Sequence, residues 1–420
     1  MPRFILLGLA ALLLILTGCD RSEGTTDAGD AAPALILISI DGFRYDYLEH
    51  LDVEAPTLRR LAAEGVQAER LIPVFPSKTF PNHYSLVTGL HPEEHGIVAN
   101  TMRDDQMAGP DGAPARFSLS NRDAVTDGRW WGGEPLWVTA EQQGMRAGIV
   151  FWPGSEAEIQ GVRPSYWLRY QDDLAHEARI DTVLAWLDLP AEERPGFLTL
   201  YFSTVDTEGH RHGPDADEVA DAIEDVDEAL ALLVEGLEAR GLTGLTDLVV
   251  VSDHGMVALS PERRVILDEA VHIGGEVDEV TWGEPVGLWP VEGVDAADLV
   301  KRIDALPHVD AYLRADVPER LRYSNHPRIP PIVLLADEGW TVTSQSYVNR
   351  YPDRPSGGTH GHDAAFDSMH GLFIAHGPRF RQGTTGPLHA VDVYGVLTTA
   401  MGLTPAPNSG DPAAVKRVLP

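Results

Sequence analysis

The chain has 420 residues, and its 64 aspartate and glutamate residues outnumber 32 lysine and arginine residues, for a formal net charge of −32. This acidity argues against a nucleic-acid duplex as partner, because the overall field repels a polyanion. It does not exclude a small phosphate ester, since a bound metal ion outweighs distant surface charge. The length fits one large domain with a smaller insertion.

The N-terminal segment is predicted to lie outside the fold. A basic residue precedes the apolar stretch Phe4–Leu16, which is too short for a spanning helix and typical of a signal-peptide core. Cys19, the only cysteine of the chain, and its three preceding residues resemble the cleavage box of bacterial lipoproteins. We expect a signal peptide over 1–18, a lipid on Cys19 and a flexible tether over 19–34. The expected location is extracytoplasmic, on the periplasmic side of the inner or outer membrane.

From residue 35 onward, apolar runs alternate with helical patterns. Short apolar runs predict strands at Leu35–Ile40, Ala147–Phe151, Gly196–Tyr201, Leu248–Ser252 and Gly371–Ala375. Apolar positions at helical spacing predict helices at Thr57–Glu64, Thr182–Asp188, Ala216–Arg240 and His389–Met401. Apolar strands that alternate with helices predict an α/β fold, with a mostly parallel sheet between layers of helices.

The pattern of predicted elements changes between residues 261 and 345. This segment contains short alternating strands, proline pairs and one helix near Ala296–Leu306. We interpret 261–345 as an inserted smaller cap, and 35–260 with 346–420 as the main domain. Residues Thr101–Trp131 are rich in Asp, Gly and Arg and are predicted to form a long surface loop near the site.

Three aspartates stand where predicted strands end. Asp41 and Asp253 directly follow apolar runs, and Asp206 comes shortly after a third. In open parallel sheets the ligand site lies beyond the carboxyl ends of the strands. The fold itself is therefore expected to bring these three carboxylates together.

Imidazole groups accompany these carboxylates. His210 follows Asp206 by four residues in a glycine-containing loop, His254 is adjacent to Asp253, and His360 lies in a late glycine-rich segment. Nitrogen and oxygen ligands without a thiolate favour zinc over manganese or another divalent ion. Two such ions would hold the attacking and leaving oxygens of an in-line displacement. The pattern predicts a metallohydrolase with two zinc ions.

A candidate nucleophile lies at Thr79, whose hydroxyl needs activation to react. If Thr79 opens a helix over Phe80–Thr88, the helix N-terminus favours a phosphate oxygen at that point. Asn100 offers an amide donor to the same anion, although an ordinary turn residue is the alternative reading.

Seven motifs in this order resemble the nucleotide pyrophosphatase/phosphodiesterase family of the alkaline phosphatase superfamily. They are Asp41–Leu48, Pro76–Tyr84, His95–Asn100, Phe151–Ser155, Asp206–His210, Ser252–Met256 and Thr359–Asp363. The resemblance covers residues 35–400 apart from the cap, and it implies an alkaline-phosphatase-like fold with two zinc ions. One ion would be held by Asp206, His210 and His360. The other would be held by Asp41, Thr79, Asp253 and His254.

The resemblance also implies roles around the metals. Thr79 would attack phosphorus and form a covalent phosphothreonine intermediate, while Asn100 and the backbone N–H of Phe80 hold a non-bridging oxygen. Tyr201 stands where the family stacks a nucleobase, and Phe80 and Tyr170 would complete the aromatic slot. Tyr201 and Tyr170 also suit purely structural positions.

The resulting hypothesis is a phosphodiesterase that hydrolyses nucleotide-type diesters or pyrophosphates to nucleoside monophosphates. One alternative keeps the metals and changes the substrate to a glycerophosphodiester, a phosphocholine ester or a monoester. Another alternative is a zinc-binding surface protein without activity. The expected partners are a small-molecule substrate and, through the lipid on Cys19, a membrane.

Overall fold

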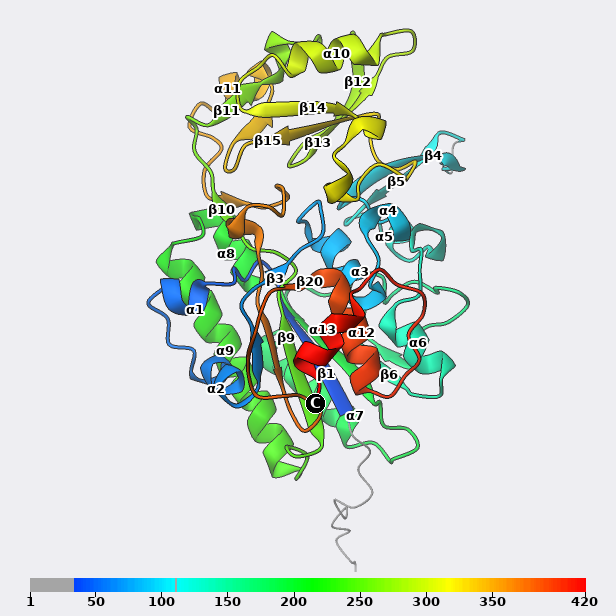
Figure 1. Ribbon diagram of the computed structural model, residues 1–420, viewed down its shortest axis with the longest axis vertical. Helices are drawn as coiled ribbons and strands as arrows, with labels where there is room; N and C mark the ends of the chain where they lie inside the picture. Colours follow the sequence, from blue (N-terminus) through cyan, green and yellow to red (C-terminus); the bar gives the residue numbers. More distant parts are fainter. Residues whose placement is uncertain (1–33, 110–111) are drawn as a thin grey trace, which may run out of the picture.

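The computed structural model describes residues 34–109 and 112–420. A large sheet runs through the lower part of the molecule, and helices cover both of its faces (Figure 1). In spatial order its strands are β19 (Gly383–Thr385), β2 (Val66–Ala68), β18 (Phe373–His376), β9 (Thr246–Val251), β1 (Ala34–Ile40), β8 (Phe197–Phe202), β6 (Ala147–Val150) and β7 (Tyr166–Trp167).

The centre of this sheet is parallel. Strand β1 pairs in parallel with β8 and β9, so that Leu35 lies beside Phe197 on one side and Asp247 on the other. Strand β18 is antiparallel to both β9 and β2. All seven residues of β1 are buried, as expected for a strand covered on both faces. The prediction of a mostly parallel α/β sheet is confirmed.

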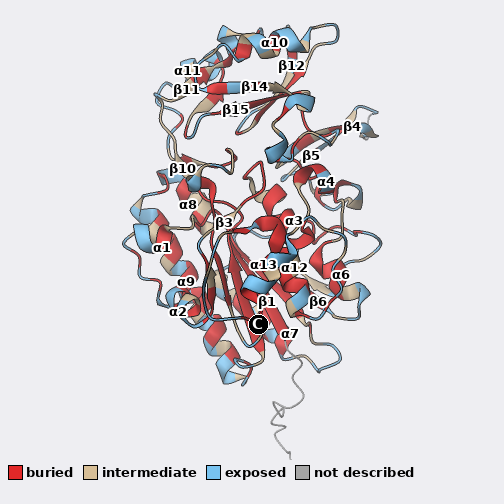
Figure 2. Ribbon diagram, in the orientation of Figure 1, coloured by how far each residue is buried: buried red, intermediate tan, exposed pale blue. Residues whose placement is uncertain are grey.

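The side chains of β1 alternate between two separate cores. Leu35 and Leu37 pack on one face, whereas Ile36, Ile38 and Ile40 pack on the other. The first face is covered by α3 (Thr79–Thr88), α6 (Leu136–Gln142), α12 (Ala390–Ala400) and α13 (Pro412–Val418). The second is covered by α1 (Tyr47–His50), α2 (Pro56–Glu64), α7 (His176–Leu187) and α9 (Asp217–Ala239). Figure 2 shows the strands and the inner sides of these helices as buried.

A smaller sheet lies above the large one (Figure 1). Its strands are, in spatial order, β12 (Val277–Thr281), β13 (Val286–Pro290), β15 (Ile332–Ala336) and β14 (Val309–Leu313). Helix α10 (Ala296–Ile303), the pair β11 (Arg264–Ile266) and β16 (Thr341–Thr343), and helix α11 (Gln345–Arg350) accompany it. This part has a core of its own, drawn from residues between Val265 and Val342.

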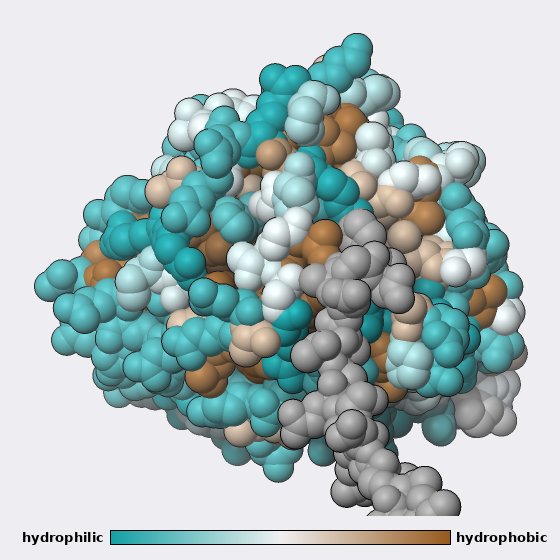
Figure 3. All heavy atoms as spheres, turned by 90° about the horizontal axis from the view of Figure 1, so that it is seen from below, coloured by the Kyte–Doolittle hydropathy of each residue, from teal (hydrophilic) through white to brown (hydrophobic). Residues whose placement is uncertain are grey.

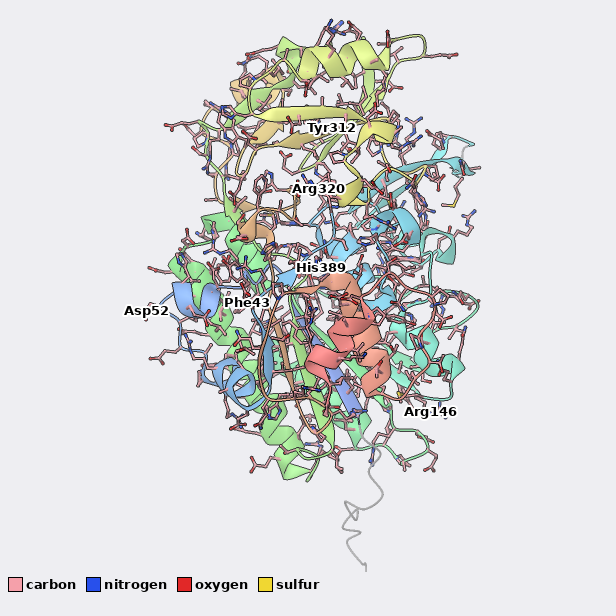
Figure 4. All side chains as sticks on the ribbon, in the orientation of Figure 1. Phe43, Asp52, Arg146, Tyr312, Arg320 and His389 are labelled. Atoms are coloured by element: carbon pink, nitrogen blue, oxygen red, sulfur yellow. The ribbon has the colours of Figure 1, made fainter. Side chains whose placement is uncertain are left out.

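One stretch of the inserted region joins the main domain. Val317, Tyr323 and Ile329 are buried in the core of the large sheet rather than in that of the small one. Arg320, labelled between the two sheets in Figure 4, forms an ion pair with Asp363 of the main domain at 2.8 Å. The insertion is therefore docked on the large domain by both apolar and charged contacts.

Two predicted local structures are wrong. Residues Thr101–Trp131 are not a surface loop: β4 (Thr101–Ala108) and β5 (Pro114–Ser118) form an antiparallel hairpin, followed by helix α5 (Arg122–Val125) and the turn η2 (Gly128–Trp130). Helix α7 begins at His176, six residues before the predicted start at Thr182. In both places polar side chains interrupt the apolar pattern: Arg103 of the hairpin pairs with Glu279, and Arg179 of α7 donates to backbone carbonyls.

The functional motifs gather at the end of the large sheet that faces the insertion. The opposite end, viewed in Figure 3, shows a mainly hydrophilic surface with scattered apolar residues around the atoms drawn in grey. Within the described residues, no helix combines the length and apolar character that a bilayer crossing requires. The predicted signal peptide, Cys19 and the tether lie outside the described residues.

Candidate active site

The three carboxylates lie just beyond the carboxyl ends of neighbouring strands. Asp41 directly follows β1, Asp253 follows β9, and Asp206 lies in the first turn of α8 (Thr204–His212), after β8. Gly42 adopts φ +69°, and a Cβ at this position would lie 2.9 Å from the backbone of Asp206. Glycine is thus required for the close approach of the segments that carry Asp41 and Asp206.

The first cluster contains Asp206, His210 and His360. Asp206 and His210 lie on helix α8 and not in the predicted loop, and their i,i+4 spacing places both side chains on one face. The Nε2 atom of His210 lies 3.5 Å from Asp206 Oδ1 and 3.1 Å from Nε2 of His360. His360 Nε2 lies 3.7 Å from the same carboxylate oxygen. The side chains of the three predicted ligands therefore converge, with one atom of each close enough to bind the same ion.

The second cluster contains the other four predicted ligands. His254 Nε2 lies 3.5 Å from Asp41 Oδ1 and 3.0 Å from Asp253 Oδ2. The Thr79 hydroxyl oxygen lies 3.4 Å from the same nitrogen. The rings of His254 and His360 stack with centroids 3.6 Å apart, which places the two clusters side by side.

Hydrogen bonds to the backbone fix the histidine rings. His210 Nδ1 contacts the carbonyl of Gly358 at 2.9 Å, His254 Nδ1 that of Gly255 at 2.9 Å, and His360 Nδ1 that of Ser77 at 2.8 Å. Each Nδ1 therefore carries the hydrogen, which leaves the Nε2 lone pair free. The Nε2 atoms of His210 and His360 then face each other as two acceptors, an arrangement that a cation between them stabilises.

In each carboxylate of the two clusters, one oxygen lacks a hydrogen-bond donor within the described part of the chain. Asp41 Oδ1, Asp206 Oδ1 and Asp253 Oδ2 are buried without a hydrogen-bond donor among the described residues. Burial raises the pKa of Asp41 well above its ordinary value, and the neighbouring Asp253 and Asp206 carboxylates raise it further. Burial likewise raises the pKa of Asp206. Divalent cations would neutralise this buried charge, and the set of oxygen and imidazole donors suits zinc.

The nucleophile candidate opens a helix, as predicted. Thr79 is the first residue of α3, and Lys78 precedes it in an extended conformation. The Phe80 N–H donates to Asn100 Oδ1 at 3.0 Å. The two groups predicted to hold a non-bridging oxygen are thus hydrogen-bonded to each other, and their contact with substrate stays a prediction. Asn100 lines the same cavity as Thr79.

A cavity of about 360 Å³ adjoins the two clusters. Phe80, Tyr170, Tyr201 and Leu119 line it, together with Thr79 and residues of both clusters. Tyr170 and Leu119 are 40% and 45% exposed, so their apolar surfaces are open to a ligand.

Tyr201 occupies a different position from that of Tyr170. It is only 9% exposed, and its hydroxyl donates to Asp41 Oδ2 at 2.5 Å. Its ring meets Tyr170 edge-on at 6.1 Å. Tyr201 therefore contacts a predicted metal ligand from the floor of the cavity, while Tyr170 presents its ring at the mouth.

Several polar groups of this site were not among the predicted ligands or catalytic residues. His83, one helical turn after Thr79, contacts the Thr79 carbonyl at 2.8 Å and the Ser39 hydroxyl at 2.8 Å. An ion pair between Arg122 and Glu156 lies in the cavity wall. The i,i+4 spacing from Thr79 could have indicated that His83 lies next to it. The ion pair joins segments far apart in the sequence, so local spacing could not indicate it.

The comparisons with known proteins agree with this geometry. The family described as type I phosphodiesterase / nucleotide pyrophosphatase matches residues 35–363. Venom phosphodiesterase 2 from Crotalus adamanteus is 37% identical over 411 residues, covering 95% of this chain and 49% of that protein. Human ectonucleotide pyrophosphatase/phosphodiesterase family member 1 is 36% identical, with 95% and 43% covered. The chain spans about half the length of these curated relatives.

Solved structures match over their whole length. Murine ectonucleotide pyrophosphatase/phosphodiesterase 5 superposes with a TM-score of 0.83 at 32% identity, covering 92% of this chain and 100% of that chain. A second structure of that murine protein is described as an inactive threonine-to-alanine variant in complex with AMP, with the same TM-score, identity and coverage. The chain belongs to the type I phosphodiesterase / nucleotide pyrophosphatase family.

Proposed function

We propose that this chain is a two-zinc phosphodiesterase that cleaves nucleotide-type diesters and pyrophosphates to nucleoside monophosphates. The observation that carries the proposal is the position of Thr79, at the start of α3 with its hydroxyl beside His254 and both ligand clusters. When bound, two zinc ions would supply Lewis-acid stabilisation of the attacking and leaving oxygens. The AMP in the inactive murine relative supports a nucleotide as substrate.

The residues of the chain account for the remaining steps. The Thr79 oxygen forms a bond to phosphorus as the bond from phosphorus to the leaving oxygen breaks. The Asn100 amide donates to a non-bridging oxygen, and the N-terminus of α3 adds its dipole. A water then attacks the phosphothreonine, releases the monophosphate and returns the Thr79 hydroxyl. Phe80 and the exposed ring of Tyr170 hold the base between them.

Hydrolysis of the p-nitrophenyl ester of thymidine 5′-monophosphate tests this proposal. The purified protein is expected to release nitrophenol only in the presence of zinc. Thr79→Ala is expected to lower kcat by at least about three orders of magnitude, since the nucleophile is lost, while most of the bound zinc is kept. No zinc-dependent turnover by the wild-type protein would refute the proposal, and full activity of Thr79→Ala would refute the role of this hydroxyl.

We also propose that the protein is held on the extracytoplasmic side of a membrane by a lipid on Cys19. The support is the apolar run that precedes the only cysteine of the chain. Expression in a bacterial host with radiolabelled fatty acid is expected to label the wild-type protein and not Cys19→Ser. Equal labelling of both proteins would contradict the lipid site.

A further inference from the structure

Ser77 lies two residues before Thr79, and its side chain is fully buried. The Ser77 hydroxyl donates to the His362 carbonyl at 2.7 Å and accepts the Gly361 N–H at 3.1 Å. The backbone carbonyl of Ser77 accepts from His360 Nδ1 at 2.8 Å. One residue beside the nucleophile is thus hydrogen-bonded three times to a segment 283 to 285 positions away, which carries a predicted metal ligand.

Both imidazoles of the first cluster are oriented through this distant segment. His210 Nδ1 donates to the carbonyl of Gly358, two residues before His360, and His360 Nδ1 donates to Ser77. The histidine of the second cluster is instead held by the carbonyl of the residue that follows it. The orientation of the first cluster relative to the nucleophile therefore depends on the hydrogen bonds at Ser77.

The chain on either side of Ser77 is held in place by Asn82 of helix α3. Asn82 is fully buried, and its amide donates to the carbonyls of Pro76 at 2.9 Å and Lys78 at 3.0 Å. These two residues flank Ser77, and Lys78 leads directly into Thr79 at the start of the same helix. Because both neighbours of Ser77 are fixed to α3, its position relative to the Thr79 hydroxyl is fixed as well.

The groups bound by the Ser77 hydroxyl are buried. Gly361 adopts φ +103°, and a Cβ there would clash with the carbonyl of Glu284, so the insertion covers this residue from the other side. His362 is only 2% exposed. Loss of the hydroxyl would leave the Gly361 N–H and the His362 carbonyl without this partner in a buried place, which favours a shift of the segment.

We propose that Ser77 is a positioning residue, which holds the Asp206, His210 and His360 cluster in place relative to the Thr79 hydroxyl. The inference rests on the proposed function, in which the Thr79 oxygen attacks phosphorus beside both clusters. Ser77 has no exposed surface, so it acts through His360 and not on the substrate. Placement of this kind matters to the rate, since a displacement of about 1 Å can lower it about 100-fold.

Two substitutions of Ser77 test the role of the hydroxyl, since Ser77→Ala removes it and Ser77→Thr keeps it. Competition with a chromophoric chelator is expected to show one of the two zinc ions bound about tenfold more weakly in Ser77→Ala. At saturating zinc, kcat for the p-nitrophenyl ester of thymidine 5′-monophosphate is expected to fall about 10- to 100-fold, while KM stays within about threefold because the nucleoside contacts are kept. Ser77→Thr is expected to restore zinc affinity and kcat to within about threefold of wild type.

Thr88→Val is the matched control, because it removes a buried hydroxyl with a similar pair of hydrogen bonds at the far end of α3. Thr88 donates to the Tyr84 carbonyl at 2.7 Å and accepts the Leu90 N–H at 3.3 Å. The control is expected to lower the urea midpoint about as much as Ser77→Ala, and to leave zinc affinity and kcat within about twofold of wild type.

Wild-type zinc affinity in Ser77→Ala would overturn the inference, and so would a loss that Ser77→Thr does not restore or that Thr88→Val reproduces. These affinities are measured without substrate, so they decide the role of Ser77 whether or not the ester is hydrolysed. A wild-type protein that binds zinc but does not turn over the ester would instead refute the proposed function.

Discussion

Replacing Tyr201 by phenylalanine removes one hydroxyl group and keeps the buried ring. That hydroxyl donates to Asp41 Oδ2 at 2.5 Å, and the other oxygen of Asp41 has no donor among the described residues. The substitution therefore leaves the Asp41 carboxylate without its hydrogen bond from the protein side. A hydrogen bond to a charged group contributes about 1.5–3 kcal/mol, which corresponds to about 10- to 100-fold in affinity.

Zinc affinity measures this effect directly. Competition with a chromophoric chelator is expected to show one of the two zinc ions bound about 10- to 100-fold more weakly in Tyr201→Phe, the usual consequence of losing a hydrogen bond to a metal ligand. Tyr170→Phe is the matched control, because its hydroxyl donates to Asp172 and not to a predicted ligand. The control is expected to bind both ions with wild-type affinity.

The same pair of variants decides between two roles for Tyr201. If the ring stacks on the nucleobase, Tyr201→Phe keeps that contact and zinc binding stays at the wild-type level. If the hydroxyl orients Asp41, zinc binding weakens and KM for a nucleotide changes little once zinc is saturating. Wild-type zinc affinity in Tyr201→Phe would refute the reasoning from the hydrogen bond.

Three further substitutions test other parts of the structure. Gly42→Ala is expected to weaken zinc binding and to destabilise the fold by about 1–3 kcal/mol, because it places a Cβ against Asp206 at a positive φ; urea titration with and without zinc measures both. Arg328→Met leaves the buried Asp104 carboxylate unpaired and is expected to cost about 3–5 kcal/mol in the free energy of unfolding; an unchanged denaturation midpoint would contradict the docking role. Phe80→Ala is expected to raise KM for nucleotides about tenfold and to change kcat far less, as steady-state kinetics would show.

The central strands and helices could be predicted because buried elements have a recognisable pattern of apolar residues in the sequence. All residues of β1, β8 and β9 are buried, and each strand is mostly apolar in sequence. The aspartates that follow these runs reach one site because parallel strands end at one edge. Local sequence therefore contained most of the information needed to predict which side chains gather at this site.

Other features of the fold and the site depend on contacts between residues far apart in the sequence. The hairpin β4–β5 contains Arg103, which pairs with Glu279 of the insertion, 176 residues away. Helix α8 is short and polar, so the turn that holds Asp206 and His210 has no apolar stripe. The contact between Tyr201 and Asp41 links residues 160 positions apart. Such pairings form only in the folded chain, and the sequence next to each residue does not indicate them.

Two cations that lie side by side at Thr79 are the central feature of the proposed mechanism. Anomalous diffraction at the zinc absorption edge, from a crystal of the protein grown with zinc, tests this claim most directly. Two peaks about 4 Å apart are expected, one among Asp206, His210 and His360 and the other among Asp41, Asp253 and His254. A single peak, or peaks away from these side chains, would contradict it.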